Sequence, residues 1–129
     1  MRPRLLFLLA LTAVSPSLQS QQLQQATHSQ AQAELGQQIY SENCAVCHLL
    51  DLTGSFEAPA LNDPNFRNNW TNRSVSDLAS LLQRTMPPQS PGSLDEEEYV
   101  SLIAFLLREN NIGPSQSDLL LTSDSVVFL

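Results

Sequence analysis

The feature that most constrains this chain is a cluster of two cysteines and a histidine. The only cysteines of the sequence lie three positions apart, and an imidazole directly follows the second: Cys44, Cys47 and His48. This spacing allows both thiols to form thioether bonds to the vinyl groups of one haem, with the imidazole held beneath the iron. Both cysteines are then used. We therefore predict one covalently attached haem c, around which the chain must fold.

The second axial ligand is predicted from the scarcity of methionine. The sequence has two methionines, and Met1 belongs to a segment that we expect to be removed, which leaves Met86 as the only thioether. Pro87 and Pro88 follow it, cannot continue a helix and push Met86 toward an extended backbone. We therefore predict that His48 and Met86 are the iron ligands. The alternative for Met86 is an adaptable core side chain.

The N-terminal residues have the pattern of an export signal. A basic start is followed by an apolar run from Leu5 to Val14, which is too short for a stable membrane anchor. We predict a signal peptide over 1–20, and hence a periplasmic location, since c-type haem is attached on the outer side of the bacterial cytoplasmic membrane. Residues 21–32 are rich in glutamine and are predicted to be a flexible lead-in.

The charge of the chain narrows its partners. Removing 1–20 takes away two of the six basic residues and leaves four against 13 acidic ones, a net charge of −9. Nucleic acid and anionic lipid headgroups repel such a chain, so we expect neither as a partner. If charge steers encounters, the partner presents a neutral or basic face; the alternative is that the charge only provides solubility.

Helical spacing dominates the remaining sequence, and no run alternates over six residues, so the predicted fold class is all-α. The first helix covers 33–43, the second 74–84, and the third follows the capping sequence 93–96 and ends near Arg108. Their apolar stripes are Leu35, Ile39 and Tyr40 in the first, Leu78, Leu81 and Leu82 in the second, and Tyr99, Leu102, Ile103, Leu106 and Leu107 in the third.

The predicted compact domain, 33–111, is small for a self-supporting core, and a macrocycle against which side chains pack solves this problem. Gly36 and Tyr40 on the first helix favour a close crossing with the last helix. The tail, 112–129, carries two apolar clusters. It either wraps back over the domain or provides a docking strand for a partner.

Taken together, these features resemble the class I c-type cytochromes over about residues 33–111. A narrower set is similar to small bacterial cytochromes that are encoded beside, or fused to, PQQ-dependent quinoprotein dehydrogenases. The wider resemblance implies a small cytochrome c-like fold with three main helices around one covalent haem. It rests on Gly36, Tyr40, Cys44, Cys47, His48, Pro59, Leu61 and Met86 to Pro88; the narrower one on 44–48, Phe66, Trp70, 86–94, Glu98 and Tyr99.

The resemblance also implies roles for residues outside the attachment motif. The carbonyl of Pro59 would accept a hydrogen bond from Nδ1–H of His48, so that Nε2 faces the iron. Trp70 and Arg73 would donate hydrogen bonds to the haem propionates; ordinary packing and a solvated charge are the alternatives. Leu61 and Phe66 are expected to pack against the haem.

The sequence departs from the family pattern at two turns. Leu49 stands where a glycine often follows the haem histidine, so the turn there is expected to differ. Asn111 stands where the narrower group tends to have glycine, and asparagine tolerates a left-handed backbone, which would preserve that turn.

Ligation by His48 and Met86 would leave no open position on the iron, and a thioether favours the ferrous state. The predicted function is therefore that of a periplasmic electron carrier without catalytic residues. It would take single electrons from a quinoprotein or other dehydrogenase toward a terminal oxidase. The chain would act as a monomer or as a subunit of a dehydrogenase.

Other functions stay open at this point. A haem sensor or peroxidase-like protein would have a displaceable sixth ligand, and His28, the only other imidazole, could replace Met86 in a bis-histidine site. Cys44 and Cys47 alone could form a thiol–disulfide pair, although no βαβ pattern surrounds them. A zinc site would need His28 together with the attachment motif, at the wrong spacing.

Overall fold

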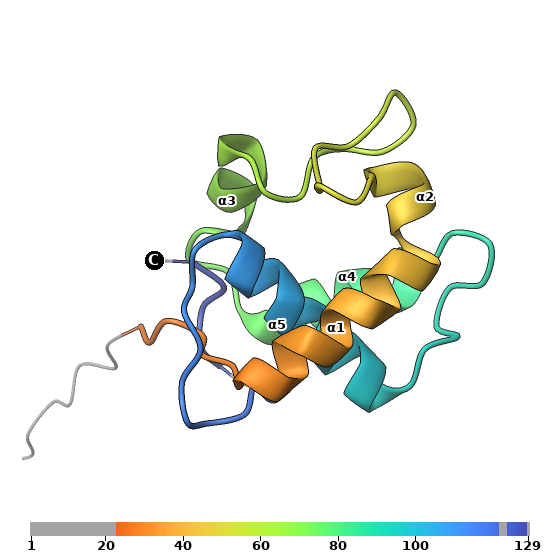
Figure 1. Cartoon of the computed structure of the whole chain (residues 1–129). Helices are drawn as coiled ribbons and strands as arrows, with labels where there is room; N and C mark the ends of the chain where they lie inside the picture. The colour runs from red at the N-terminus through yellow and green to blue at the C-terminus, as the bar shows by residue number, and fades with distance from the viewer. Residues whose placement is uncertain (1–22, 122–123, 129) are drawn as a thin grey trace, which may run out of the picture.

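The computed structural model of the chain describes residues 23–121 and 124–128, so the predicted signal peptide, 1–20, lies outside the described residues. The helices in this part of the chain, shown in Figure 1, are α1 (Gln30–Asn43), α2 (Ala45–His48), α3 (Pro64–Trp70), α4 (Val75–Thr85) and α5 (Glu96–Glu109). Extended pairing among the same residues is limited to three isolated bridges, so the predicted all-α class is confirmed. Within 23–121 and 124–128, no helix has the length and apolarity needed to cross a membrane.

Helices α1 and α5 cross in close contact near the middle of the molecule (Figure 1). A Cβ atom added at Gly36 would lie 1.9 Å from the carbonyl oxygen of Ser101 and 2.9 Å from Cβ of Phe105. Beside this contact the rings of Tyr40 and Phe105 lie 5.0 Å apart between centroids. The predicted close crossing is therefore present, with glycine where the two backbones meet.

The apolar stripe of α1 differs in one residue from the prediction. Leu35 is exposed, whereas Ala33, Gly36, Ile39 and Tyr40 are buried. Because α5 approaches so closely, the face of α1 that it covers has small side chains at its centre. A large apolar residue such as Leu35 has no room in that contact and lies beside it.

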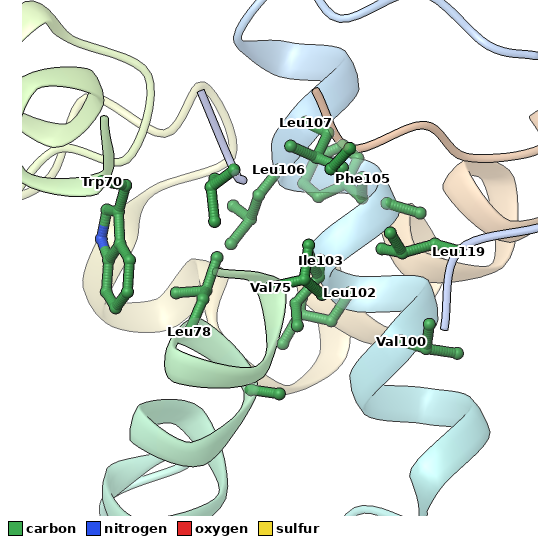
Figure 2. Close-up of a cluster of buried hydrophobic side chains, with 14 of the residues drawn as sticks. Trp70, Val75, Leu78, Val100, Leu102, Ile103, Phe105, Leu106, Leu107 and Leu119 are labelled. Atoms are coloured by element: carbon green, nitrogen blue, oxygen red, sulfur yellow. The ribbon is translucent and has the colours of Figure 1, made fainter. Parts of the chain in front are cut away.

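Helix α5 is the central element of the core. Its residues from Tyr99 to Leu107 are all buried, which means that the helix is covered on every side rather than along one stripe. Figure 2 shows α5 with Leu78 of α4 and the tail residue Leu119 on different sides of it. The predicted third helix is thus correct in position, but its buried surface is wider than the stripe indicated.

Side-chain caps fix where the longer helices begin. Ser74 caps α4 and forms a capping box with Asp77, as predicted. For α5 the predicted box at 93–96 is displaced: the cap is Asp95, which accepts a hydrogen bond from Glu98 N at 2.9 Å, while Glu98 Oε2 accepts from Asp95 N at 2.8 Å. The reciprocal box thus lies two residues further along than the sequence indicated.

We expect the Asp95→Ala variant to lose about 1 kcal/mol of the free energy of unfolding, the usual cost of removing an N-cap acceptor. Denaturant unfolding would measure it. Asp95→Asn is the matched control, because the amide oxygen can still accept from the backbone of Glu98. If both variants lose the same amount, the charge of Asp95 stabilises the helix and the cap bond does not.

Two short helices were not predicted. Helix α2 is a single turn within the cysteine motif, and α3 has seven residues, so neither is long enough to show a periodic stripe. The start of α3 does carry a local signal. Asp63 accepts a hydrogen bond from the backbone of Phe66, and Pro64 occupies the first turn, the arrangement that favours a helix N-terminus.

From residue 23 onward, where the structure describes it, the lead-in is packed against the rest of the chain, and α1 begins at Gln30 rather than near residue 33. Ala26 and His28 are fully buried. Ala26 N donates to Val126 O at 2.8 Å, and Val126 N donates to Gln24 O at 2.8 Å. Glutamine content alone indicated disorder, but backbone hydrogen bonds to a distant segment order these residues.

The tail wraps back over the domain. In the apolar cluster 119–121 Leu119 is buried and Leu120 is exposed, whereas in the second cluster Val126, Val127 and Phe128 are all buried. Of the two alternatives for the tail, the structure therefore favours packing over a free docking strand. The end of the described chain lies beside the connection between α3 and α4 (Figure 1).

Candidate haem-binding site

A cavity of about 650 Å³ opens between the attachment motif on one side and the end of α4 on the other. Its volume lies within the range of roughly 300–1,000 Å³ that is usual for cofactor sites. Most of its lining is apolar, and the charged lining residues are Glu57 and Asp63, both acidic. The cavity is lined by six of the seven predicted site residues: Cys44, Cys47, His48, Pro59, Trp70 and Met86.

His48 is held in one orientation. It ends the single turn of α2, is buried, and its Nδ1 lies 2.8 Å from the carbonyl oxygen of Pro59. A carbonyl only accepts, so Nδ1 must carry the hydrogen, and Nε2 keeps its lone pair free. The contact that the resemblance implies is therefore present, and it leaves the nitrogen that binds metals available.

The two cysteines lie at the edge of the same cavity, and neither is in a disulfide. Cys44 is the residue between α1 and α2, so the single turn of α2 brings both thiols to the cavity. Burial raises the pKa of the Cys44 thiol to about 11, so it is protonated at neutral pH. Thiol–disulfide exchange needs a thiolate, and this shift disfavours that alternative.

The turn after His48 has a positive φ angle, which glycine adopts readily, but the residue there is Leu49. Leu49 adopts φ 63°, a left-handed value that is strained for a bulky side chain. Its carbonyl accepts a hydrogen bond from the Tyr40 hydroxyl at 2.7 Å, and its N–H donates to Ala45 O at 2.9 Å. Asn111 also has a left-handed backbone, with φ 68°, as its residue type allows.

Met86 follows the last residue of α4 and lines the cavity. Its backbone is extended, with φ −129° and ψ 144°, as the following proline predicts. Two hydrogen bonds fix this residue: its N–H donates to Leu82 O at 2.7 Å, and its carbonyl accepts from the Tyr99 hydroxyl at 2.9 Å. Tyr99 thus joins α5 to the Met86 backbone.

This role of Tyr99 was not predicted: the sequence placed the residue in an apolar stripe and in the narrower family resemblance. A signal was available. A buried tyrosine among aliphatic residues needs a partner for its hydroxyl group. The sequence does not say which backbone carbonyl provides that partner.

Trp70 and Arg73 lie together, but only Trp70 reaches the cavity. The indole is buried in the cavity wall, whereas Arg73 is exposed, with its Cζ atom 4.3 Å from the centroid of the Trp70 ring. This is a cation–π contact. Leu61 and Phe66, expected to pack against the haem, both line the cavity.

A buried amide that no sequence pattern indicated secures another wall of the cavity. Asn110 follows the last residue of α5, and its Nδ2 donates to Leu61 O at 2.8 Å and to Leu106 O at 2.8 Å. Arg67 donates to Asn110 Oδ1 at 3.3 Å and to Asn62 O at 3.0 Å. These bonds tie the segment that follows Pro59 to α3 and α5.

His28 lies at the other end of α1 from the cysteines. Its Nε2 is 2.9 Å from Ile112 O and its Nδ1 is 3.0 Å from Ser29 O, so both ring nitrogens already face backbone carbonyls. A helix of 14 residues spans about 21 Å. His28 is therefore remote from the cavity, which removes the support for bis-histidine ligation.

The same separation disfavours zinc. The described ranges, 23–121 and 124–128, contain no group of three or more His, Cys, Asp and Glu side chains placed to hold a metal ion. The cavity instead fits a haem: it is apolar, of suitable size, and presents two thiols, a free imidazole nitrogen and a thioether.

A helical fold with this motif beside such a cavity defines the chain as a c-type cytochrome. The family described as cytochrome c oxidase, cbb3-type, subunit III, matches residues 31–106, more than half of the sequence, and the chain belongs to that family. The match spans α1 to most of α5 and includes every predicted site residue. Comparisons with curated proteins and with solved structures gave no match.

Proposed function

We propose that this c-type cytochrome carries single electrons on one haem, bound through Cys44 and Cys47, with His48 and Met86 as axial ligands. The observation that carries the proposal is that all four side chains line one apolar cavity. The haem, when bound, supplies an iron that cycles between Fe(III) and Fe(II). The protein contributes by positioning the ligands and by excluding water from the cavity.

The two proposed ligands come from different parts of the chain, His48 at the end of α2 and Met86 directly after α4. Pro59 orients His48 by accepting from Nδ1–H, and Tyr99 holds the backbone of Met86. Such bonds keep the ligand geometry the same in both oxidation states, so little rearrangement accompanies electron transfer. The apolar lining disfavours the state with the higher charge, and the thioether acts in the same direction.

The proposed redox partners are inferred from the net charge of the chain and from its predicted export. The N-terminal pattern supports a periplasmic carrier, and the acidic surface supports a partner with a neutral or basic face. Glu57 and Asp63, which line the cavity, carry the same sign as the net charge. The proposed donor is a quinoprotein or other dehydrogenase, and the proposed acceptor is a terminal oxidase.

The first test counts the haem. We expect protein produced in a host that matures c-type cytochromes to contain one haem per chain in a pyridine haemochrome assay, and its denatured intact mass to include that haem. The double variant Cys44→Ser, Cys47→Ser is the control and should give a bare chain after denaturation. A bare native chain from such a host would contradict the proposal.

A further inference from the structure

The last residues of the described chain join two segments that are far apart in sequence. We call residues 124–128 the C-terminal strap. On one side it pairs with the lead-in through Val126, which bonds to Gln24 and Ala26. On the other side it holds the connection between α3 and α4 by two backbone bonds, Asn72 N to Phe128 O at 2.8 Å and Val127 N to Arg73 O at 2.8 Å. A third bond, from Val75 N to Ser125 O at 3.0 Å, holds the first residue of α4.

This connection follows directly from the cavity wall. Trp70, the last residue of α3, lines the cavity, and the connection runs from Thr71 to Ser74. Asn72 has a left-handed backbone with φ 58°, so the turn is tight and mildly strained. The backbone bonds from the C-terminal strap hold this turn in place. The position of the turn fixes where α3 ends.

The side chain of Phe128 supports the same wall. It is buried, and its ring meets that of Phe66 edge to face, with 6.2 Å between centroids. Phe66 lines the cavity, whereas Phe128 does not. Phe128 therefore packs behind a residue that is expected to contact the haem.

We propose that the C-terminal strap positions Phe66 and Trp70 against the haem and so sets its midpoint potential. This inference rests on the proposed function. Loss of the Phe128 ring would leave space behind Phe66, loosen the wall and admit water to the cavity. Water stabilises the more highly charged ferric state, so the potential should fall.

The test compares two buried tail residues. Phe128→Ala removes the ring behind the cavity wall, and Phe128→Leu keeps most of its volume. Leu119→Ala is the matched control, because Leu119 is equally buried in the tail but does not line the cavity, and its backbone bonds to Gln32. Both truncations to alanine remove a large buried side chain and should lower stability by a similar amount.

We expect Phe128→Ala to shift the preference between Fe(II) and Fe(III) about tenfold toward Fe(III), or ~59 mV downward for a one-electron couple. Phe128→Leu should shift it less in the same direction, and Leu119→Ala should leave it unchanged. Trp70 is the only tryptophan, and the haem should quench its fluorescence. Its emission should increase in Phe128→Ala and not in Leu119→Ala.

Unchanged potential and emission in both Phe128 variants would overturn the proposal and leave the strap as a stabilising element only. An equal shift in Leu119→Ala would overturn it as well, because a general loosening would then explain the effect. If Phe128→Ala fails to fold, Phe128→Leu decides. A native protein without haem would overturn the proposed function and this inference together, which the haemochrome assay shows first.

Discussion

Replacing Met86 by alanine should change the spectrum, the ligand binding and the potential of the protein together. The ferric form should lose its long-wavelength absorption band from the iron–sulfur bond, and the reduced form should bind CO readily at neutral pH. Loss of the thioether also removes its preference for Fe(II). If that preference is about a hundredfold, the midpoint potential falls by ~120 mV, at 59 mV for each factor of ten.

Pro88→Ala is the matched control for this variant. Pro88 lies in the same loop, lines the same cavity and is exposed, but it offers no atom that binds iron. Its spectrum should be native. A Met86→Ala protein with the native ferric spectrum would show that the thioether is not the ligand. Ready binding of CO to the native protein would instead favour the alternative of a sensor or a peroxidase-like protein.

The parts of this protein that short-range patterns encode could be predicted from the sequence. The spacing of Cys44, Cys47 and His48 indicated that these three side chains act at one site, and all three line the cavity. Pro87 forces an extended Met86, and α4 ends at the residue before it. Ser74 marks the start of α4 because its capping partner is three residues away. Each of these depends on neighbours in sequence.

The parts that depend on pairing between distant segments could not be predicted. The lead-in has too few apolar side chains to indicate order, yet Ala26 is buried because its backbone pairs with Val126. Asn110 looks like an ordinary polar residue after a helix, but its amide reaches Leu61 across the cavity wall. Such bonds are invisible until the fold brings the partners together.

The site shows the same division. The residues of the attachment motif, which are expected to contact the haem, line the cavity. The roles of Tyr99 and Phe128, which hold cavity residues in place, were not predicted. The role of Arg73 stays a prediction that rests on the family resemblance. Its guanidinium lies over the ring of Trp70, which lines the cavity, but Arg73 itself does not line it.

The crossing of α1 and α5 can be tested by replacing Gly36 with alanine. Whether stability rises or falls distinguishes helix propensity from backbone contact. In an open helix position, replacing glycine by alanine stabilises by about 1 kcal/mol, since alanine loses less conformational entropy. Gly36 is in a helix, so propensity alone predicts a gain. The added Cβ, however, would lie 1.9 Å from the backbone oxygen of Ser101. A backbone oxygen cannot rotate away, so the two helices must separate.

We therefore expect Gly36→Ala to lose roughly 1–3 kcal/mol of the free energy of unfolding, the usual cost of overpacking a core, or more. The loss should reach the site, because Tyr40 of α1 and Leu102 and Leu106 of α5 all line the cavity. Denaturant unfolding of the holoprotein measures it. Gly113→Ala is the matched control: nothing lies within 4 Å of its added Cβ, so its stability should be native or slightly higher. A Gly36→Ala protein as stable as Gly113→Ala would mean that the helices are not in backbone contact, and that the crossing does not fix the spacing of the cavity walls.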